Sequence, residues 1–157
     1  MDEPTASRHP RVGWLLVLAG ALGIVTGVIP LTTNAMRILV NENLWNVVDL
    51  AAHGVEAMGL SVEWGMLSSA MGACLGVLLL WAGAGWLKGR AWAGPVSWAY
   101  VLVGLTVNVT DMIIFAFRAR AGVMRTQMLV FDGIALLLPV ALGAWLLHRG
   151  HKARRAA

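Results

Sequence analysis

Four apolar runs, each about as long as a lipid bilayer is thick, constrain this chain more than any other feature of its sequence. They cover about residues 12–29, 65–87, 95–117 and 128–147. A helix of about 20 mainly apolar residues crosses the hydrocarbon core of a membrane. We therefore expect one all-α domain over residues 1–157, a polytopic membrane protein built as a four-transmembrane-helix bundle.

The composition agrees with this class and excludes others. Hydrophobic residues make up 59% of the chain and charged residues 13%, whereas soluble domains carry roughly a quarter charged residues. The net charge of +4 does not indicate a nucleic-acid partner, because Lys and Arg lie between and beyond the apolar runs. Such charges are typical of a protein that is oriented in a bilayer. The lipid bilayer is thus the first expected partner.

The distribution of basic residues predicts the orientation. Four spans place both termini on one side, together with the turn at residues 88–90. That side carries eight basic residues: Arg8, Arg11, Lys88, Arg90, Arg149, Lys152, Arg154 and Arg155. The other side carries four: Arg37, Arg118, Arg120 and Arg125. The positive-inside rule therefore favours a bacterial inner (plasma) membrane protein with cytoplasmic N- and C-termini.

The long segment between the first and second runs has its own periodicity. Apolar residues recur at helical spacing over about residues 42–60, and polar residues occupy the opposite face: Glu42, Asn46, Asp49, His53 and Glu56. This pattern predicts an external amphipathic helix at the membrane surface. Asp49, His53 and Glu56 are candidate ligands for a divalent cation or members of a proton relay. The alternative is that they form the wet face of a surface helix.

Small residues line the first two runs. The first has Gly20, Gly23 and Gly27, and we expect Pro30 to end or kink its helix. The second has Gly65, Ser69, Gly72, Gly76 and Gly83 close to one stripe. Such faces favour close helix contact, within the chain or with a partner. We expect Cys74, the single cysteine, to be a small packing residue.

The third run carries the most costly residue. Ser97, Gly104, Asn108 and Asp111 share one helical face. A carboxylate in the membrane costs on the order of 2.5–3.5 kcal/mol, so Asp111 should face a partner, a cavity or water. Asp132 of the fourth run lies at a matching depth on the next, antiparallel helix, and two like charges there cannot both ionise cheaply.

Plainer interpretations of these residues stay open. Asp111 can form a structural ion pair with Arg118 or Arg120, and Asp132 can act as a favourable charge in the first turn of its helix. The eight tryptophans are expected to be mostly interface anchors. We find no haem, nucleotide or iron-sulfur motif in the sequence, so the cofactor is unknown and a divalent cation is the one open candidate.

The second run ends in the turn WLKGRAWAG, and the third carries an acidic residue before an arginine-containing outer loop. In this layout the last ninety or so residues resemble the small four-helix bacterial membrane proteins of the DoxX-like and BphX-like kind. The resemblance rests on layout and transfers no functional residues. The amphipathic segment departs from it.

Three functions follow from these features. The first is an accessory or interaction subunit of a membrane complex, associating with itself or with another membrane protein through its glycine faces. The second is a small cation- or proton-coupled transport or binding protein that uses Asp111 and Asp132, with Asn108 as a further ligand. The third is a membrane-embedded enzyme with a site at Asp49, His53 and Glu56. The absence of a complete catalytic set in the sequence favours a non-enzyme.

Overall fold

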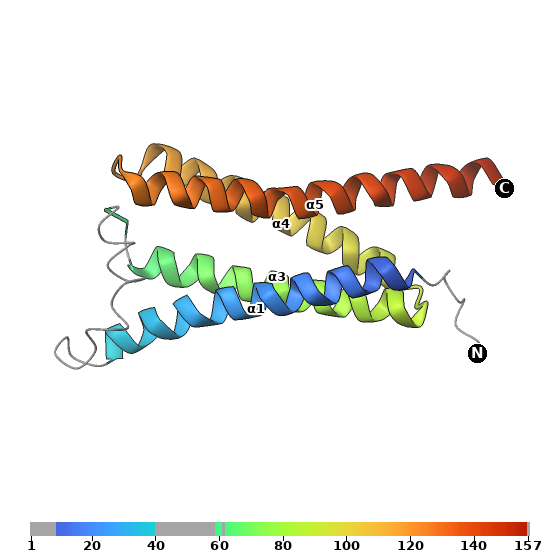
Figure 1. The fold of residues 1–157 in the computed structure, drawn as a ribbon, viewed down its shortest axis with the longest axis horizontal. Helices are drawn as coiled ribbons and strands as arrows, with labels where there is room; N and C mark the ends of the chain where they lie inside the picture. Colours follow the sequence, from blue (N-terminus) through green and yellow to red (C-terminus); the bar gives the residue numbers. More distant parts are fainter. Residues whose placement is uncertain (1–8, 40–58, 61, 157) are drawn as a thin grey trace.

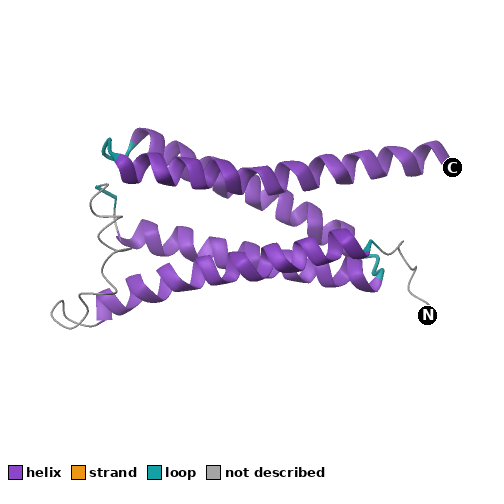
Figure 2. Cartoon of the chain, in the orientation of Figure 1, coloured by secondary structure: helices purple, strands orange, loops and turns teal. Residues whose placement is uncertain are grey.

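A computed structural model of the chain describes residues 9–39, 59–60 and 62–156. This part forms four long α-helices: α1 (Pro10–Leu39), α3 (Val62–Lys88), α4 (Ala93–Phe117) and α5 (Val123–Ala156) (Figures 1 and 2). Each contains a segment long and apolar enough to cross a membrane: Pro10–Thr32, Glu63–Lys88, Ala93–Phe117 and Arg125–His151. Successive helices run in opposite directions, so α1 begins and α5 ends at the same end of the bundle.

α1 and α3 pack backbone against backbone through glycines spaced seven residues apart. A Cβ atom on Gly20 would lie 2.6 Å from the Gly76 carbonyl oxygen, and one on Gly83 would lie 2.7 Å from the Gly13 carbonyl oxygen. Only residues without a side chain allow so close an approach. The glycine faces of the first two apolar runs therefore meet each other within the chain at Gly20, Gly27, Gly76 and Gly83, whereas a Cβ atom on Gly72 would meet no atom within 4 Å.

α4 and α5 form the second pair, and α3 joins it to the first. Gly104 of α4 lies beside Leu75 of α3 and Pro139 of α5, and Gly143 of α5 lies against Val101 of α4. Figure 1 shows that α4 leaves α5 and reaches α3 at the end where α3 turns into α4, and that toward the other end α4 lies beside α5, apart from α1 and α3.

The main core draws on all four helices. It consists of Leu16, Leu75, Leu79, Ala82, Trp86, Ala93, Tyr100, Val101, Leu142 and Leu146. A smaller cluster lies at the opposite end, where Phe115 and Ala119 pack with Leu60, Met128 and Leu129. Most apolar contact between the two helix pairs is therefore concentrated toward the end that holds the termini.

The outer faces of the helices are also apolar. On α1, Leu15, Leu18, Leu22, Val25 and Ile29 are each more than half exposed, and the other three helices carry similar exposed stripes. Cys74 is likewise exposed on α3, so its expected role in packing is wrong. Large exposed apolar surfaces are unusual on soluble monomers and usual on helices that face lipid.

Two helices are longer than the apolar runs. Pro30 does not end the first helix, because α1 continues to Leu39, and the alternative that Pro30 kinks it stays a prediction. A proline removes only one backbone donor, and a helix can continue past it. α5 begins at Val123 and not near residue 128, so Arg125 and its polar neighbours form its first turns. The apolar runs mark the membrane-like stretch and not the helix ends.

The predicted amphipathic helix at residues 42–60 lies almost entirely outside the described residues, as do Asp49, His53 and Glu56. Its conformation and position stay predictions.

Candidate functional site

The predicted polar face of α4 is turned toward the interior. Ser97, Gly104 and Asp111 are all buried, and Asn108 is half-buried. Asp111 is only 7% exposed, and Ser97 is fully buried. The face that carries the costly carboxylate thus packs against the rest of the bundle, while the opposite face of α4, with Leu102 and Ile113, is exposed. This arrangement follows from the cost of placing a carboxylate on an apolar surface.

Asp111 is held by a residue of α3. The Ser68 hydroxyl donates a hydrogen bond of 2.8 Å to Asp111 Oδ2. Neither Arg118 nor Arg120 forms an ion pair with Asp111, and both arginines are exposed. The structural ion pair that the sequence allowed is therefore wrong. An α3 hydroxyl takes the place of an arginine as the partner of this carboxylate.

Asp132 lies level with Asp111 on the neighbouring helix. From the contact between Gly104 and Pro139, seven residues along each antiparallel helix lead to Asp111 and to Asp132. Seven residues are about two helical turns, so both carboxylates lie on the faces that make this contact. The two carboxyl groups therefore share one region between the helices.

One oxygen of Asp132 has an unusual environment. Its Oδ2 atom is buried, and no described residue donates a hydrogen bond to it. A buried acceptor without a donor is costly, so such groups in native proteins usually mark a site for a water, an ion or a proton. The interpretation of Asp132 as a charge in the first helical turn is wrong, because α5 begins at Val123, nine residues earlier.

Asn108 is less available than the sequence suggested. Its side-chain nitrogen donates a hydrogen bond of 2.7 Å to the Gly104 carbonyl of the preceding turn. This bond within the helix orients the amide and leaves its oxygen as the only acceptor. Asn108 stays a candidate through that oxygen, one turn from Asp111.

Ser68 is the residue of this region that the sequence did not single out. Serine in an apolar helix most often bonds a carbonyl of its own helix, as Ser69 does with Gly65 at 2.7 Å. The sequence signal that could have pointed to Ser68 was its position along the second apolar run. Ser68 lies near the start of the second run, at the same end of the bundle as Asp111. The site formed by the Asp111 and Asp132 side chains is called the carboxylate site below.

The carboxylate site contains few metal ligands. Within the described ranges, no three His, Cys, Asp or Glu side chains gather as a metal centre. Two carboxylates suit a hard cation or a proton, and the Ser68 hydroxyl is already bonded to one of them. Whether Asp49, His53 or Glu56 adds to them lies outside the described residues.

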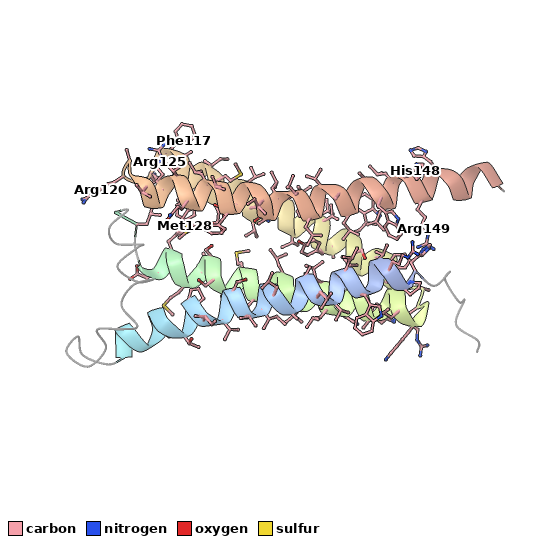
Figure 3. The ribbon with its side chains drawn as sticks, in the orientation of Figure 1. Phe117, Arg120, Arg125, Met128, His148 and Arg149 are labelled. Carbon is pink, nitrogen blue, oxygen red and sulfur yellow. The ribbon has the colours of Figure 1, made fainter. Side chains whose placement is uncertain are left out.

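A second cluster lies at the end of the bundle that holds the termini. Trp86 and Trp145 contact edge to face, at 5.3 Å between ring centroids, and His9 meets both rings. The Arg149 guanidinium lies 4.5 Å over the Trp86 ring, and Figure 3 shows Arg149 at this end. Trp86 is only 2% exposed, so it is a tryptophan that does not act as an interface anchor. It is a core residue that donates a hydrogen bond to Ser97.

Comparison with known proteins adds no family to this description, since no family model, curated protein or solved structure matches the chain. The DoxX-like resemblance therefore stays a prediction.

Proposed function

We propose that this chain is a multi-pass protein of a bacterial inner membrane, with both termini in the cytoplasm. The support is the four long apolar helices and their exposed apolar stripes. Arg11, Lys88 and Arg90 are exposed at the end that holds the termini, and they agree with a cytoplasmic location of that end. The carboxylate site then lies toward the outer side of the bilayer.

Within this membrane protein, we propose that Asp111 and Asp132 bind a cation or a proton for transport or sensing. The observation that carries the proposal is the buried Asp132 Oδ2 atom, which lacks a donor among the described residues beside a second carboxylate. A positive charge between the two groups relieves their repulsion and satisfies this oxygen. Ser68 fixes Asp111 in place for that role.

The experiment compares sodium and proton binding in variants of the two carboxylates. Wild-type protein in nanodiscs is titrated with sodium by calorimetry, while a soluble dye records protons released. We expect binding with proton release. Asp111→Asn or Asp132→Asn should weaken sodium binding by at least about tenfold, because even the loss of a group that only orients a metal ligand typically lowers affinity by that factor. Glu63→Gln is the control, because Glu63 is an exposed acid of the same membrane half.

Far-UV circular dichroism and the elution volume show whether each variant keeps its fold. Wild-type protein that neither binds sodium nor exchanges a proton with pH would overturn the proposal. So would an Asp111→Asn protein that binds normally. A variant that loses binding only because it unfolds favours a structural role for Asp111.

The other two functions lack a comparable observation. The glycine faces that the accessory-subunit hypothesis used are largely occupied by the contact between α1 and α3. A homo-oligomer or a membrane-protein partner would have to use the outward apolar stripes, which lipid covers equally well. The enzyme hypothesis depends on Asp49, His53 and Glu56, which lie outside the described residues.

A further inference from the structure

Among the described residues, the Trp86–Ser97 and Ser68–Asp111 side-chain hydrogen bonds both connect α3 to α4, and they differ in chemistry. Near the turn between these helices, Trp86 Nε1 donates to Ser97 Oγ at 2.9 Å, and both residues are buried. Near the other end, Ser68 donates to Asp111 at 2.8 Å. The first bond joins two groups that do not ionise. The second has an ionisable acceptor, so its strength depends on the charge of Asp111.

The helix pairs on either side of these bonds are stiff units. In the first pair, the Gly20, Gly76 and Gly83 backbones touch the facing helix, which leaves no room for sliding. In the second pair, Val101 packs on Gly143, and Arg125 donates a hydrogen bond of 2.6 Å to the Ala116 carbonyl across the α4–α5 connection. Relative motion is therefore expected between the pairs and not within them.

The contact between the pairs is uneven along the bundle. The main core lies toward the Trp86 end, where the α3–α4 turn also holds the pairs together. Around Ser68 the packing is looser, because a Cβ atom on Gly72, one turn away, would meet no atom within 4 Å. Figure 1 shows the α4 ribbon moving away from α3 toward this end. Apart from the small cluster around Phe115, little apolar packing thus joins the pairs near the Ser68–Asp111 bond.

We propose that the Ser68–Asp111 hydrogen bond is a latch between the α1–α3 pair and the α4–α5 pair, and that a cation or proton at the carboxylate site opens it. The proposal rests on the proposed function of that site. Asp111 as a carboxylate accepts a charge-assisted bond, roughly twice as strong as a neutral one. Neutralising Asp111 weakens the bond, and the pairs then separate about the Trp86 end.

The charged groups around Asp111 agree with this role. Asp132 lies level with it on α5, the Arg125 guanidinium of α5 is bonded to the Ala116 carbonyl, and Ser68 on α3 is uncharged. Glu63 of α3 is exposed, and Arg118 and Arg120 are exposed without an ion pair to Asp111. Among the described side chains of α1, only Arg11 is charged, and it lies at the opposite end. The ligand at the carboxylate site is therefore the group that sets the charge of Asp111.

Distances between spin labels test the latch. In a Cys74→Ala background, one label pair at Leu67→Cys and Val130→Cys spans the two units near the latch, on exposed positions of α3 and α5. A control pair at Lys88→Cys and His148→Cys reports the Trp86 end. Wild-type protein in nanodiscs is measured without sodium at high pH, with sodium, and at low pH. We expect the first pair to shift by more than about 2 Å, the size of a rearrangement, and the control pair to stay fixed.

Two variants give opposite signatures. Ser68→Ala removes the donor, so the latch end should be open under all three conditions. Asp132→Asn weakens the site but leaves Asp111 charged, so the latch end should stay closed when sodium is added. Hydrogen bonds to charged groups are stronger than neutral ones. Neutralising Asp111 in the wild-type protein should therefore change the ratio of open to closed populations at the latch end by roughly fivefold or more.

The outcomes separate this inference from the proposed function. If wild-type protein binds sodium or a proton but the label distances of Ser68→Ala equal those of wild type under every condition, the latch is wrong and the binding site stands. If wild-type protein binds neither, the proposed function fails. Any ligand-dependent change that survives in Ser68→Ala also overturns the latch.

Discussion

His9 lies at the start of α1 in contact with two tryptophans and an arginine. Its ring meets Trp86 and Trp145 edge on, with centroid distances of 5.6 and 5.4 Å. Burial, and then the positive charge of Arg149, lower the pKa of His9 from its ordinary value of 6.5. The neutral ring is therefore the form that suits the folded protein, and it joins the N-terminal end of α1 to α3 and α5.

The pH dependence follows from the sign of this shift. Because the folded-state pKa is lowered, the contribution of His9 to stability is fully present above about pH 6.5 and is lost as the pH falls toward the folded-state value. NMR titration of the His9 ring, assigned by its loss in His9→Gln, should give a midpoint below that of an unstructured histidine. When the pH is lowered from about 8 to about 5, the melting temperature of His9→Gln should also fall less than that of the wild-type protein. A His9 midpoint at or above 6.5 would contradict the burial argument.

Single residues show where prediction from the sequence worked and where it failed. The inward position of Asp111 and its level match with Asp132 could be predicted, because a carboxylate in an apolar helix must turn away from lipid and depth follows from residue counting. Its partner could not. Arg118 and Arg120 offered a charge nearby, but they lie beyond the end of α4, whereas Ser68 faces Asp111 at its own level. Which residue of α3 faces Asp111 on α4 could not be predicted, because the rotation of one helix against another does not follow from its hydropathy.

At the scale of helices, the glycine contacts between α1 and α3 make a sharp prediction about stability. A Cβ atom on Gly76 would lie 2.6 Å from the Ile24 backbone nitrogen and 2.8 Å from the Gly20 carbonyl oxygen. Neither backbone atom can move alone, so Gly76→Ala must push the helices apart, and overpacking of this kind costs about 1–3 kcal/mol. Unfolding by a denaturing detergent, followed by circular dichroism, measures the effect.

Gly72 is the matched control, one turn from Gly76 on the same helix. A Cβ atom there would meet nothing within 4 Å, so Gly72→Ala should be neutral or stabilise the helix by up to about 1 kcal/mol through its propensity. Equal losses in both variants would show that the close contact between α1 and α3 does not limit stability.

The helices also explain why their ends and partners were predicted less well than their existence. Hydropathy detects the part of a helix that avoids water, so it located all four helices. It missed the less apolar turns with which α1 ends, at Leu39, and with which α5 begins, at Val123. Small-residue stripes show that a face can approach another backbone closely. They do not distinguish a neighbour in the same chain from one in another molecule, and here the seven-residue spacing on both runs matches within the chain.

At the scale of the whole molecule, the apolar exterior surrounds a core that contains a few polar groups. Leu18, Leu22 and Leu102 are each more than 60% exposed, whereas Ser97 and Asp111 are buried. This distribution is the reverse of the one found in water-soluble proteins, in which large apolar side chains are mostly buried and charged side chains are mostly exposed. Cys74 lies on that exterior, in the middle of α3, and it therefore gives a natural probe of the surroundings of the bundle.

Labelling with a membrane-impermeant maleimide tests both the membrane location and the orientation. In intact spheroplasts Cys74 should not react although it is exposed on the protein, because lipid excludes the reagent, and it should react after denaturation. In a Cys74→Ala background, Ala121→Cys in the α4–α5 connection should be labelled from outside. Ala91→Cys in the α3–α4 connection should be labelled only after the cells are opened, because both positions are exposed in the structure but lie at opposite ends of the bundle. Rapid labelling of Cys74 in intact membranes would contradict a lipid-facing α3, and the reverse pattern at Ala121 and Ala91 would place the termini outside.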